Sequence, residues 1–187
     1  MKKIITLCLI GIMSLSLVGC GSTNKSTSNT GNETAQETKG TFSDLISMPK
    51  FEVKDIDDNV VTNDIFTNKN LTMINIWGTF CSPCIEEMPI LQELSTEYEG
   101  KGVNVIGVVA DGEENEVGAL KMLKKLKVNY TNLIPNEAFK KDFVSKTNAV
   151  PVTVFVNNKG EILETVVGDR NKEQFKQLIE NHLNNQK

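Results

Sequence analysis

The chain has 187 residues, with 24 acidic and 20 basic side chains and a formal net charge of −4. This acidic balance gives no support to nucleic-acid binding, which favours a basic face, so no nucleic-acid partner is expected. The charge is more simply a feature that keeps a protein surface hydrated.

The N-terminus has the pattern of an export signal. Lys2 and Lys3 precede an apolar run over residues 4–18, which is shorter than the about 20 residues that a membrane-crossing helix needs. A positive start followed by a short apolar run predicts a signal peptide, which we assign to residues 1–19. The protein is therefore expected to be extracytoplasmic, in an oxidising environment where disulfides persist.

Residues 17–20 read LVGC and resemble the lipobox of bacterial lipoproteins. The resemblance implies cleavage before Cys20, whose thiol would carry a diacylglycerol and anchor the chain to the cell membrane of a bacterium. The alternative is an ordinary signal peptide, or a short membrane anchor, with an incidental cysteine. Residues 20–40 are small and polar, which predicts a flexible tether. The folded domain is then expected at residues 41–187, a suitable length for one core.

Along this domain, apolar β-branched runs alternate with helical patterns. Strands are predicted at 71–77, 103–110 and 130–134, with a strand or hairpin at 51–66 (turning at 57–59) and a hairpin of 150–156 with 161–167. Helices are predicted at 83–99, 113–127, 137–145 and 172–184. The expected buried residues are Val117, Leu120, Leu123 and Leu126 in the second helix, and Phe175, Leu178, Ile179 and Leu183 in the last. This order predicts a three-layer α/β fold with a mixed sheet.

Two cysteines, Cys81 and Cys84, follow the predicted strand 71–77 and begin the next helix. A Cys-x-x-Cys pair in this place is typical of a redox motif. Pro83 suits the first helical turn, where its missing N–H is not needed. The unpaired N–H groups and the positive end of the helix dipole favour the thiolate of Cys81. Cys81 is therefore predicted to attack a partner, and Cys84 to resolve the mixed disulfide.

A zinc site is the alternative interpretation of the two thiols. Zinc takes four ligands, and outside the predicted signal and lipidated cysteine the chain adds only His182. We therefore predict no metal and no cofactor other than the Cys81–Cys84 disulfide. His182 is expected to be an exposed or capping residue near the end of the last helix.

Glu87 stands out on the helix that follows the cysteines. At 100° per residue, it falls inside the apolar stripe, close to Cys84, whereas Glu86 falls on the solvent side. Burial should raise the pKa of such a carboxyl toward the range of a thiol. Glu87 is thus the candidate general acid and base for Cys84. The alternative is that its side chain bends out to solvent.

Pro89 lies five residues after Cys84 in the same helix. A proline inside a helix removes one hydrogen bond and bends the axis. The apolar spacing continues through Leu91, Leu94 and Tyr98, which favours a helix that passes through Pro89 over one that ends there.

Several of these residues together resemble the thioredoxin fold. They are Trp77, Cys81, Cys84 and Pro89, with the later segment Val150-Pro151-x-Thr153. The chain most resembles the TlpA/ResA-like branch of membrane-tethered, extracytoplasmic thiol–disulfide oxidoreductases. The resemblance implies a mixed central sheet flanked by helices, an N-terminal strand or hairpin extension, and a central helical insertion at 113–127.

The resemblance also implies roles for single residues. Pro151 would be a cis-proline facing the disulfide, and Glu87 matches a glutamate that ResA-like members use near the active site. Asn75 takes the position of the buried aspartate of cytoplasmic thioredoxins. The implied partner-binding residues are Trp77, Phe80, Ser82, Pro83 and Val150. Two departures are the Ser82-Pro83 dipeptide, which leaves the direction of electron flow open, and Val152-Thr153 where Thr-Thr is common.

The function that the resemblance implies is reduction of disulfides in exported clients, such as apocytochrome c, spore-envelope proteins or methionine sulfoxide reductase. Electrons would come from a membrane thiol carrier of the CcdA/DsbD kind, and a monomer is expected. The alternatives are a disulfide-forming oxidase or isomerase, and a non-catalytic surface-binding lipoprotein with a structural disulfide. A peroxiredoxin is disfavoured because its Thr-x-x-Cys would need threonine where Gly78 stands.

Overall fold

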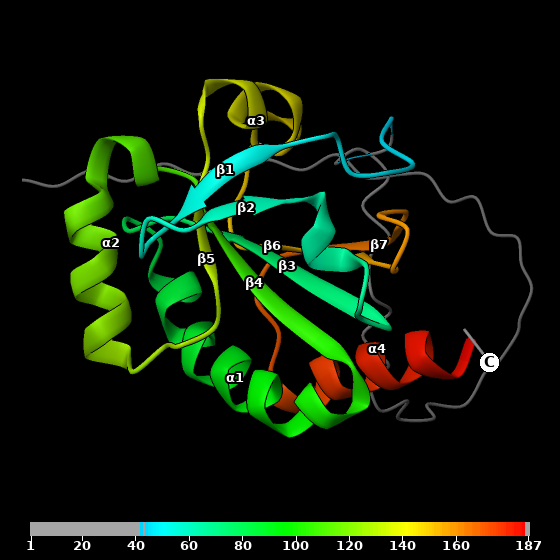
Figure 1. The fold of residues 1–187 in the computed structure, drawn as a ribbon. Helices are drawn as coiled ribbons and strands as arrows, with labels where there is room; N and C mark the ends of the chain where they lie inside the picture. Colours follow the sequence, from blue (N-terminus) through cyan, green and yellow to red (C-terminus); the bar gives the residue numbers. More distant parts are fainter. Residues whose placement is uncertain (1–41, 43, 186–187) are drawn as a thin grey trace, which may run out of the picture. The chain divides into compact units, whose positions relative to one another are not determined.

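One seven-stranded sheet organises the protein in the computed structural model, which describes residue 42 and residues 44–185 (Figure 1). The strands are β1 (Glu52–Asp55), β2 (Val60–Thr62), β3 (Leu71–Trp77), β4 (Val103–Val109), β5 (Asn132–Ile134), β6 (Val152–Val156) and β7 (Ile162–Val167). The helices are α1 (Ser82–Tyr98), α2 (Gly112–Leu126), α3 (Glu137–Asp142) and α4 (Lys172–Asn185). The strand order is β2-β1-β5-β4-β3-β6-β7. Strands β3, β4 and β5 pair in parallel and the other pairs are antiparallel, which confirms the predicted mixed α/β sheet.

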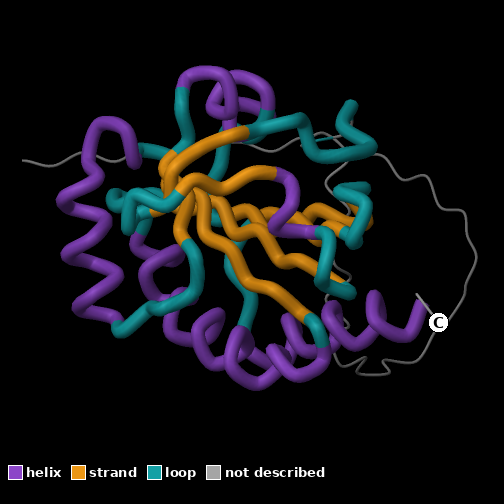
Figure 2. Tube along the Cα trace, in the orientation of Figure 1, coloured by secondary structure: helices purple, strands orange, loops and turns teal. Residues whose placement is uncertain are grey.

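The strands lie between two layers of helices and loops (Figure 2). Side chains alternate between the faces of a strand, and β3 is buried along its whole length. Its residues Leu71, Met73 and Trp77 pack in the core with α1, α2 and α4. Ile74 and Ile76 point to the other face, where α3 and the N-terminal segment pack. An uninterrupted apolar run is what a strand covered on both faces requires.

Helices α1 and α4 lie side by side on one face of the sheet. α1 continues through Pro89 to Tyr98, as the apolar spacing predicts. Two of its outward glutamates, Glu93 and Glu97, pair with Lys172 and Lys176 of α4 at 2.8 and 2.7 Å. Such half-exposed pairs stabilise a protein by about 0–1 kcal/mol each, so the apolar contacts dominate this packing.

Three predicted elements differ in detail from the structure. Residues 63–66 form a 3-10 turn instead of continuing the hairpin strand, with the Thr62 hydroxyl accepting a hydrogen bond from the Asp64 amide. The predicted helix 137–145 ends at Asp142, and a 3-10 turn over 144–146 follows. In α4, Phe175 and Ile179 are buried, whereas Leu178 and Leu183 are only partly buried.

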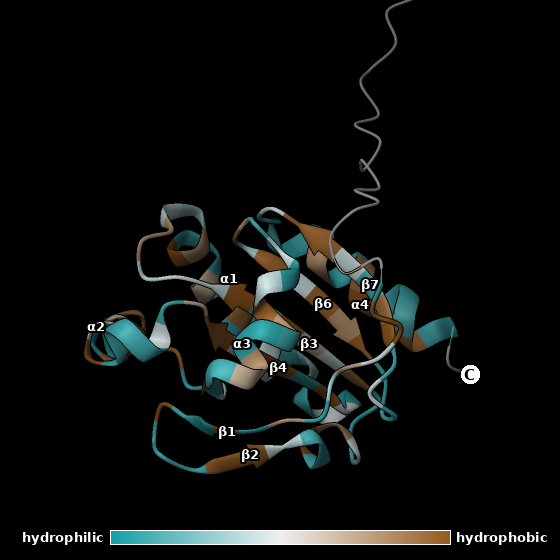
Figure 3. Ribbon diagram, turned by 90° about the horizontal axis from the view of Figure 1, so that it is seen from above, coloured by the Kyte–Doolittle hydropathy of each residue, from teal (hydrophilic) through white to brown (hydrophobic). Residues whose placement is uncertain are grey.

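The predicted apolar stripe of α2 is wrong at its first position. Val117 is 66% exposed, and the buried residues of the helix include Ala119 and Leu123. The cause is the three-residue spacing itself, because at 100° per residue each step falls about 60° short of a full turn and Val117 lies about 120° away from Leu123. The first turn of α2 also has a break at Asn115, whose φ of −141° and ψ of 39° are not helical, but this break precedes all four residues of the predicted stripe. α2 is drawn mostly in teal in Figure 3, in agreement with its many charged residues.

The N-terminal predictions fall on residues that the structure does not describe. The signal peptide, Cys20 and the whole predicted tether at 20–40 lie outside residues 42 and 44–185. Within the described part, none of the helices has the length and apolar content to cross a bilayer.

Candidate active site

The two cysteines lie at the N-terminal end of α1 and are joined as a disulfide. Cys81 is the N-cap residue, and its sulfur accepts a hydrogen bond from the Cys84 amide at 3.3 Å. Pro83 occupies the first turn, where a helix has N–H groups without internal partners. Cys81 is 6% exposed and Cys84 is not exposed at all. Cys81 is therefore the sulfur that a partner can reach, and negative charge on it is favoured by the helix terminus.

Glu87 lies one turn further along α1 and is 2% exposed. The Asn75 side-chain amide donates to Oε1 of Glu87 at 2.9 Å, and the Arg170 backbone N–H donates to Oε2 at 3.2 Å. Burial outweighs these hydrogen bonds and raises the pKa of the Glu87 carboxyl to about 8. The predicted position on the core face is confirmed, and the alternative that the side chain bends to solvent is wrong.

Asn75 connects three elements beneath the cysteines. Its Nδ2 donates to Glu87 of α1 and also to the Thr153 hydroxyl of β6, at 3.1 Å. Asn75 and Thr153 are themselves buried and are cross-strand neighbours of β3 and β6. A buried polar group is stable only with partners, so this set fixes how α1 sits on the sheet.

Pro151 lies at the start of β6, and the Val150–Pro151 peptide bond is cis, as the resemblance implies. The register pairs Val152 with Ile76, which places Pro151 at the end of β3 where the cysteine loop begins. The carbonyl of Pro151 accepts a hydrogen bond from the Gly168 amide at 2.9 Å. Pro151 is buried, whereas Val150 is half-buried.

The predicted partner-binding residues divide into two groups. Phe80 is 71% exposed, and Ser82 and Pro83 are exposed beside it in sequence. Trp77 is instead fully buried, and its indole N–H donates to Asn132 Oδ1 at 2.9 Å. Because no part of Trp77 reaches the surface, it supports the site from below and does not form the contact surface that was expected of it.

A polar cluster that the sequence analysis missed holds the loop before Cys81. The Thr79 backbone N–H donates to Asp111 Oδ1 at 3.0 Å, and the Thr79 hydroxyl donates to Asp111 Oδ2. Asn115 Nδ2 donates to the Thr79 hydroxyl at 2.8 Å. The sequence could have indicated this cluster through the parallel pairing of β3 and β4. Trp77 and Val109 are partners in register, so residues two positions beyond each meet at the same edge.

His182 is not the exposed or capping residue that was expected. Its Nε2 lies 2.8 Å from Glu164 Oε2, its side chain is 14% exposed, and its ring packs 4.9 Å from the Phe155 ring. These contacts belong to the packing of α4 on β6 and β7. Among the residues that the structure describes, there is no group of three or more His, Cys, Asp or Glu side chains that could hold a metal ion.

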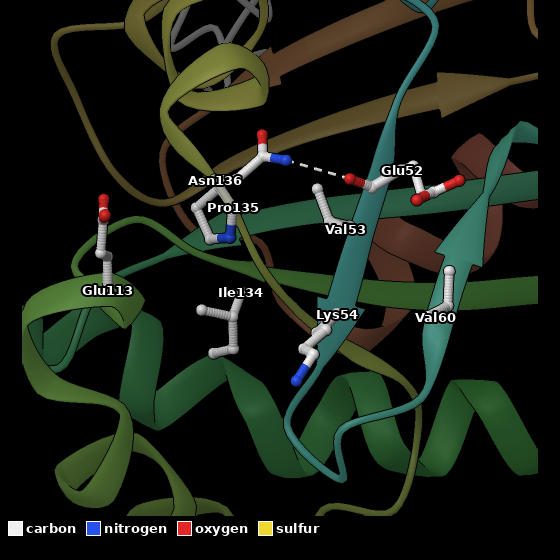
Figure 4. Close-up of a pocket in the computed structure, with 8 residues that line it drawn as sticks. All are labelled: Glu52, Val53, Lys54, Val60, Glu113, Ile134, Pro135 and Asn136. Carbon is white, nitrogen blue, oxygen red and sulfur yellow. Dashed lines mark hydrogen bonds between the residues drawn. The ribbon is translucent and has the colours of Figure 1, made fainter.

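A cavity of about 350 Å³ lies between the β1–β2 hairpin, the start of α2 and the segment after β5 (Figure 4). Its apolar lining comes from Val53, Val60, Ile134 and Pro135, and Asn136 Nδ2 closes one side by donating to the Glu52 carbonyl at 3.0 Å. None of the cysteine-site residues lines this cavity. It is therefore separate from the disulfide.

Known proteins similar to this chain share the same chemistry. The sequence profile of the Redoxin family matches residues 46–181. The thiol-disulfide oxidoreductase ResA of Bacillus cereus (strain ZK / E33L) is 26% identical over 132 residues, which cover 71% of this chain and 74% of ResA. The ResA of Oceanobacillus iheyensis is 32% identical over 124 residues, covering 64% of this chain and 62% of that protein.

The fold is found again among solved structures. The crystal structure of StoA from Bacillus subtilis superposes with a TM-score of 0.58 at 23% identity, covering 72% of this chain and 98% of StoA. The matched Redoxin profile spans most of the chain. The ResA relatives are named thiol-disulfide oxidoreductases, and this site has the disulfide that such chemistry uses. The chain therefore belongs to the Redoxin family, as a TlpA/ResA-like thiol–disulfide oxidoreductase.

Proposed function

We propose that this protein reduces disulfides in exported client proteins. The observation that carries the proposal is the disulfide at the tip of α1, with Cys81 the more exposed of its two sulfurs and a buried carboxyl, Glu87, on the next turn. Thiol–disulfide exchange itself follows from the family. The direction of exchange is the proposed part.

The proposed reaction begins with the reduced protein. The Cys81 thiolate attacks one sulfur of the client disulfide, a mixed disulfide forms, and the other client sulfur leaves as a thiolate. Cys84 then gives its proton to the Glu87 carboxylate and attacks the Cys81 sulfur. The second client sulfur then leaves as a thiolate and the Cys81–Cys84 disulfide forms, so two electrons pass to the client. Of the two protons that complete the client dithiol, one returns from Glu87 and the other comes from water. Glu87 suits this task because a pKa of about 8 is close to that of a thiol.

The protein's surroundings in the cell are also part of the proposal. The signal-like N-terminus and the LVGC segment support a lipid on Cys20 that holds a monomer outside the cell membrane. A membrane thiol carrier of the CcdA/DsbD kind would restore the dithiol, and apocytochrome c or methionine sulfoxide reductase are the proposed clients. No cofactor beyond the disulfide enters the reaction.

The reduction potential of the Cys81–Cys84 pair tests the direction. A value near that of thioredoxin, about −270 mV, is expected for a reductase, and a value near −120 mV would instead make the protein an oxidase. A Cys84→Ser variant should trap clients as mixed disulfides in cells. If it traps none, the cysteines form a structural disulfide in a binding lipoprotein, and the proposal fails.

A further inference from the structure

A groove with an apolar floor and basic edges runs between α1 and α2. It encloses about 330 Å³ and is lined by Ile85, Gly118, Lys121, Met122, Lys125 and Leu126. Residues 118, 121, 122 and 125 share one face of α2, because helical positions three and four apart are neighbours. In Figure 1, α2 stands beside the first turns of α1. The groove therefore lies next to the helix end that carries the cysteines.

The distance from this groove to the reactive sulfur is short. Ile85 follows Cys81 by four residues, and its backbone N–H donates to the Cys81 carbonyl at 3.2 Å. Because Cys81 is the N-cap of α1, Ile85 lies about one helical turn, about 5.4 Å, further along the helix axis. An extended chain advances about 3.3 Å per residue, so a segment bound at Cys81 reaches the groove within about two residues.

Two sets of polar contacts hold the groove between the helices. At the start of α2, Asp111 and Asn115 bond to Thr79 in the loop before Cys81. At the other end, the Asn129 backbone N–H donates to Gln92 Oε1 of α1 at 2.6 Å. α2 is thus attached to the cysteine region on both sides of the groove. The groove is part of the folded structure and needs no rearrangement to form.

The charge of the groove indicates what it binds. Lys121 and Lys125 are exposed, and within residues 44–185 neither of them forms an ion pair. Ile85, Met122 and Leu126 are only half-buried, so they present apolar surface between the two lysines. These cations stand on a protein whose formal net charge is −4. A partner with carboxylates and an apolar side chain is complementary to this surface.

We propose that the groove between α1 and α2 docks client segments that carry an apolar residue and acidic residues close to the reacting cysteine. The inference rests on the proposed thiol–disulfide exchange and adds a selection rule to it. The apolar side chain lies on Ile85, Met122 and Leu126, and the carboxylates pair with Lys121 and Lys125. Docking raises the local concentration of the client sulfur at Cys81 and leaves the exchange chemistry unchanged.

The experiment uses the reduced protein and three synthetic peptides, each with one cysteine blocked as a mixed disulfide with thionitrobenzoate. Their sequences are Glu-Leu-Ser-Cys-Ser-Leu-Glu, the same peptide with Lys for Glu, and the first peptide with Ser for Leu. The Cys81 thiolate bonds to the peptide sulfur, the old disulfide breaks, and thionitrobenzoate leaves as a coloured anion. Because each peptide sequence reads the same from both ends, it can bind in the groove with its chain in either direction.

The acidic apolar peptide should react about threefold to tenfold faster than the other two, although the protein's net charge disfavours it. The double variant Lys121→Glu/Lys125→Glu should reverse the preference between the Glu and Lys peptides. The matched control, Lys124→Glu/Lys127→Glu, makes the same charge change at the C-terminal end of α2 and at the residue that caps it, outside the groove, and should keep the wild-type order. At about 1 M salt the charge preference should nearly vanish.

Three outcomes would overturn the inference. They are equal rates for the acidic and basic peptides, an equal effect of the two double variants, and a groove variant that changes only the binding of anionic phospholipid vesicles. The last outcome would make the lysines a membrane contact. Reaction with the small disulfide dithionitrobenzoate separates the two proposals. If the protein reduces it but shows no peptide preference, only the groove is wrong, and if it does not, the exchange function is wrong.

Discussion

Glu87 is a carboxyl group that the fold keeps largely protonated at neutral pH. Its pKa of about 8 comes first from burial, which penalises the charged form. The hydrogen bonds from Arg170 and Asn75 favour the charged form and offset this effect only in part. A pKa one unit above the ambient pH leaves about one tenth of the group ionised. A residue in this state can both take a proton from a neighbouring thiol and return it.

The first prediction concerns this proton transfer. In the reaction of reduced protein with dithionitrobenzoate, the first coloured anion reports attack by Cys81 and the second reports resolution by Cys84. We expect Glu87→Gln to leave the first step nearly unchanged and to slow the second by about tenfold or more. The part of the rise of the second rate that follows the ionisation of Glu87 near pH 8 should also disappear.

Glu86→Gln is the matched control for this prediction. Glu86 is adjacent in sequence but exposed, so its removal should leave both steps and their pH profiles as in the wild type. If Glu87→Gln retains the wild-type pH profile of resolution, Glu87 has no part in moving the Cys84 proton.

At the scale of elements, strands β3 and β4 carry the site through non-local contacts. Trp77 of β3 bonds to Asn132 of β5 across the intervening strand β4. Gly107 of β4 leaves the room for that bond, because a Cβ atom there would lie 1.9 Å from Asn132 Oδ1 and 3.0 Å from Trp77 Nε1. The floor beneath the cysteine loop thus depends on a glycine in the middle strand.

The second prediction follows from that close approach. Gly107→Ala should break the Trp77–Asn132 hydrogen bond and destabilise the protein by about 2–4 kcal/mol, from overpacking and a lost buried bond. Gly100→Ala is the control, because a Cβ at that position meets nothing within 4 Å. Urea unfolding followed by the fluorescence of Trp77, the single tryptophan, measures both. Equal stabilities of the two variants would contradict this account of Gly107.

Local patterns in the sequence were sufficient for most elements and for three of the site residues. The apolar run of β3, the Cys-x-x-Cys pair and the phase of Glu87 are all encoded within one or two turns of chain. The stripe of α2 failed because a three-residue spacing drifts around the helix, whereas the missed Thr79 cluster and the misplaced Trp77 have long-range causes. Asn115 breaks α2 while its side chain bonds Thr79, 36 residues earlier, and Trp77 is buried by a contact to Asn132, 55 residues later. Neither contact is visible in a window of neighbouring residues.

At the scale of the whole molecule, the raised pKa of Glu87 links stability to pH. In the unfolded chain this carboxyl titrates near 4.5, and in the folded protein near 8. Between these values the folded state holds the additional proton. Its contribution is therefore fully present below pH 4.5 and is lost as the pH rises to 8.

The third prediction is a fall in stability on the alkaline side. From pH 5 to 8 the free energy of unfolding should decrease by up to about 1.4 kcal/mol per pH unit relative to Glu87→Gln, whose side chain does not titrate. Urea unfolding of both proteins across this range measures the difference. Glu97, Glu114 and Glu180 have pKa values lowered by lysine partners, so their effect on stability lies at acid pH and cancels in the comparison. A constant difference between the two proteins would mean that the folded pKa is not raised.

Because α2 is attached at both its ends, these contacts determine which of its residues can be exchanged for those of a relative. A chimaera that exchanges the helix with that of a relative must retain Asp111 and Asn115 at one junction and the Gln92–Asn129 contact at the other. Exchange of residues 116–126 alone satisfies both conditions. Exchange of this one short segment would then change which clients bind, while the Cys81–Cys84 pair stays as it is.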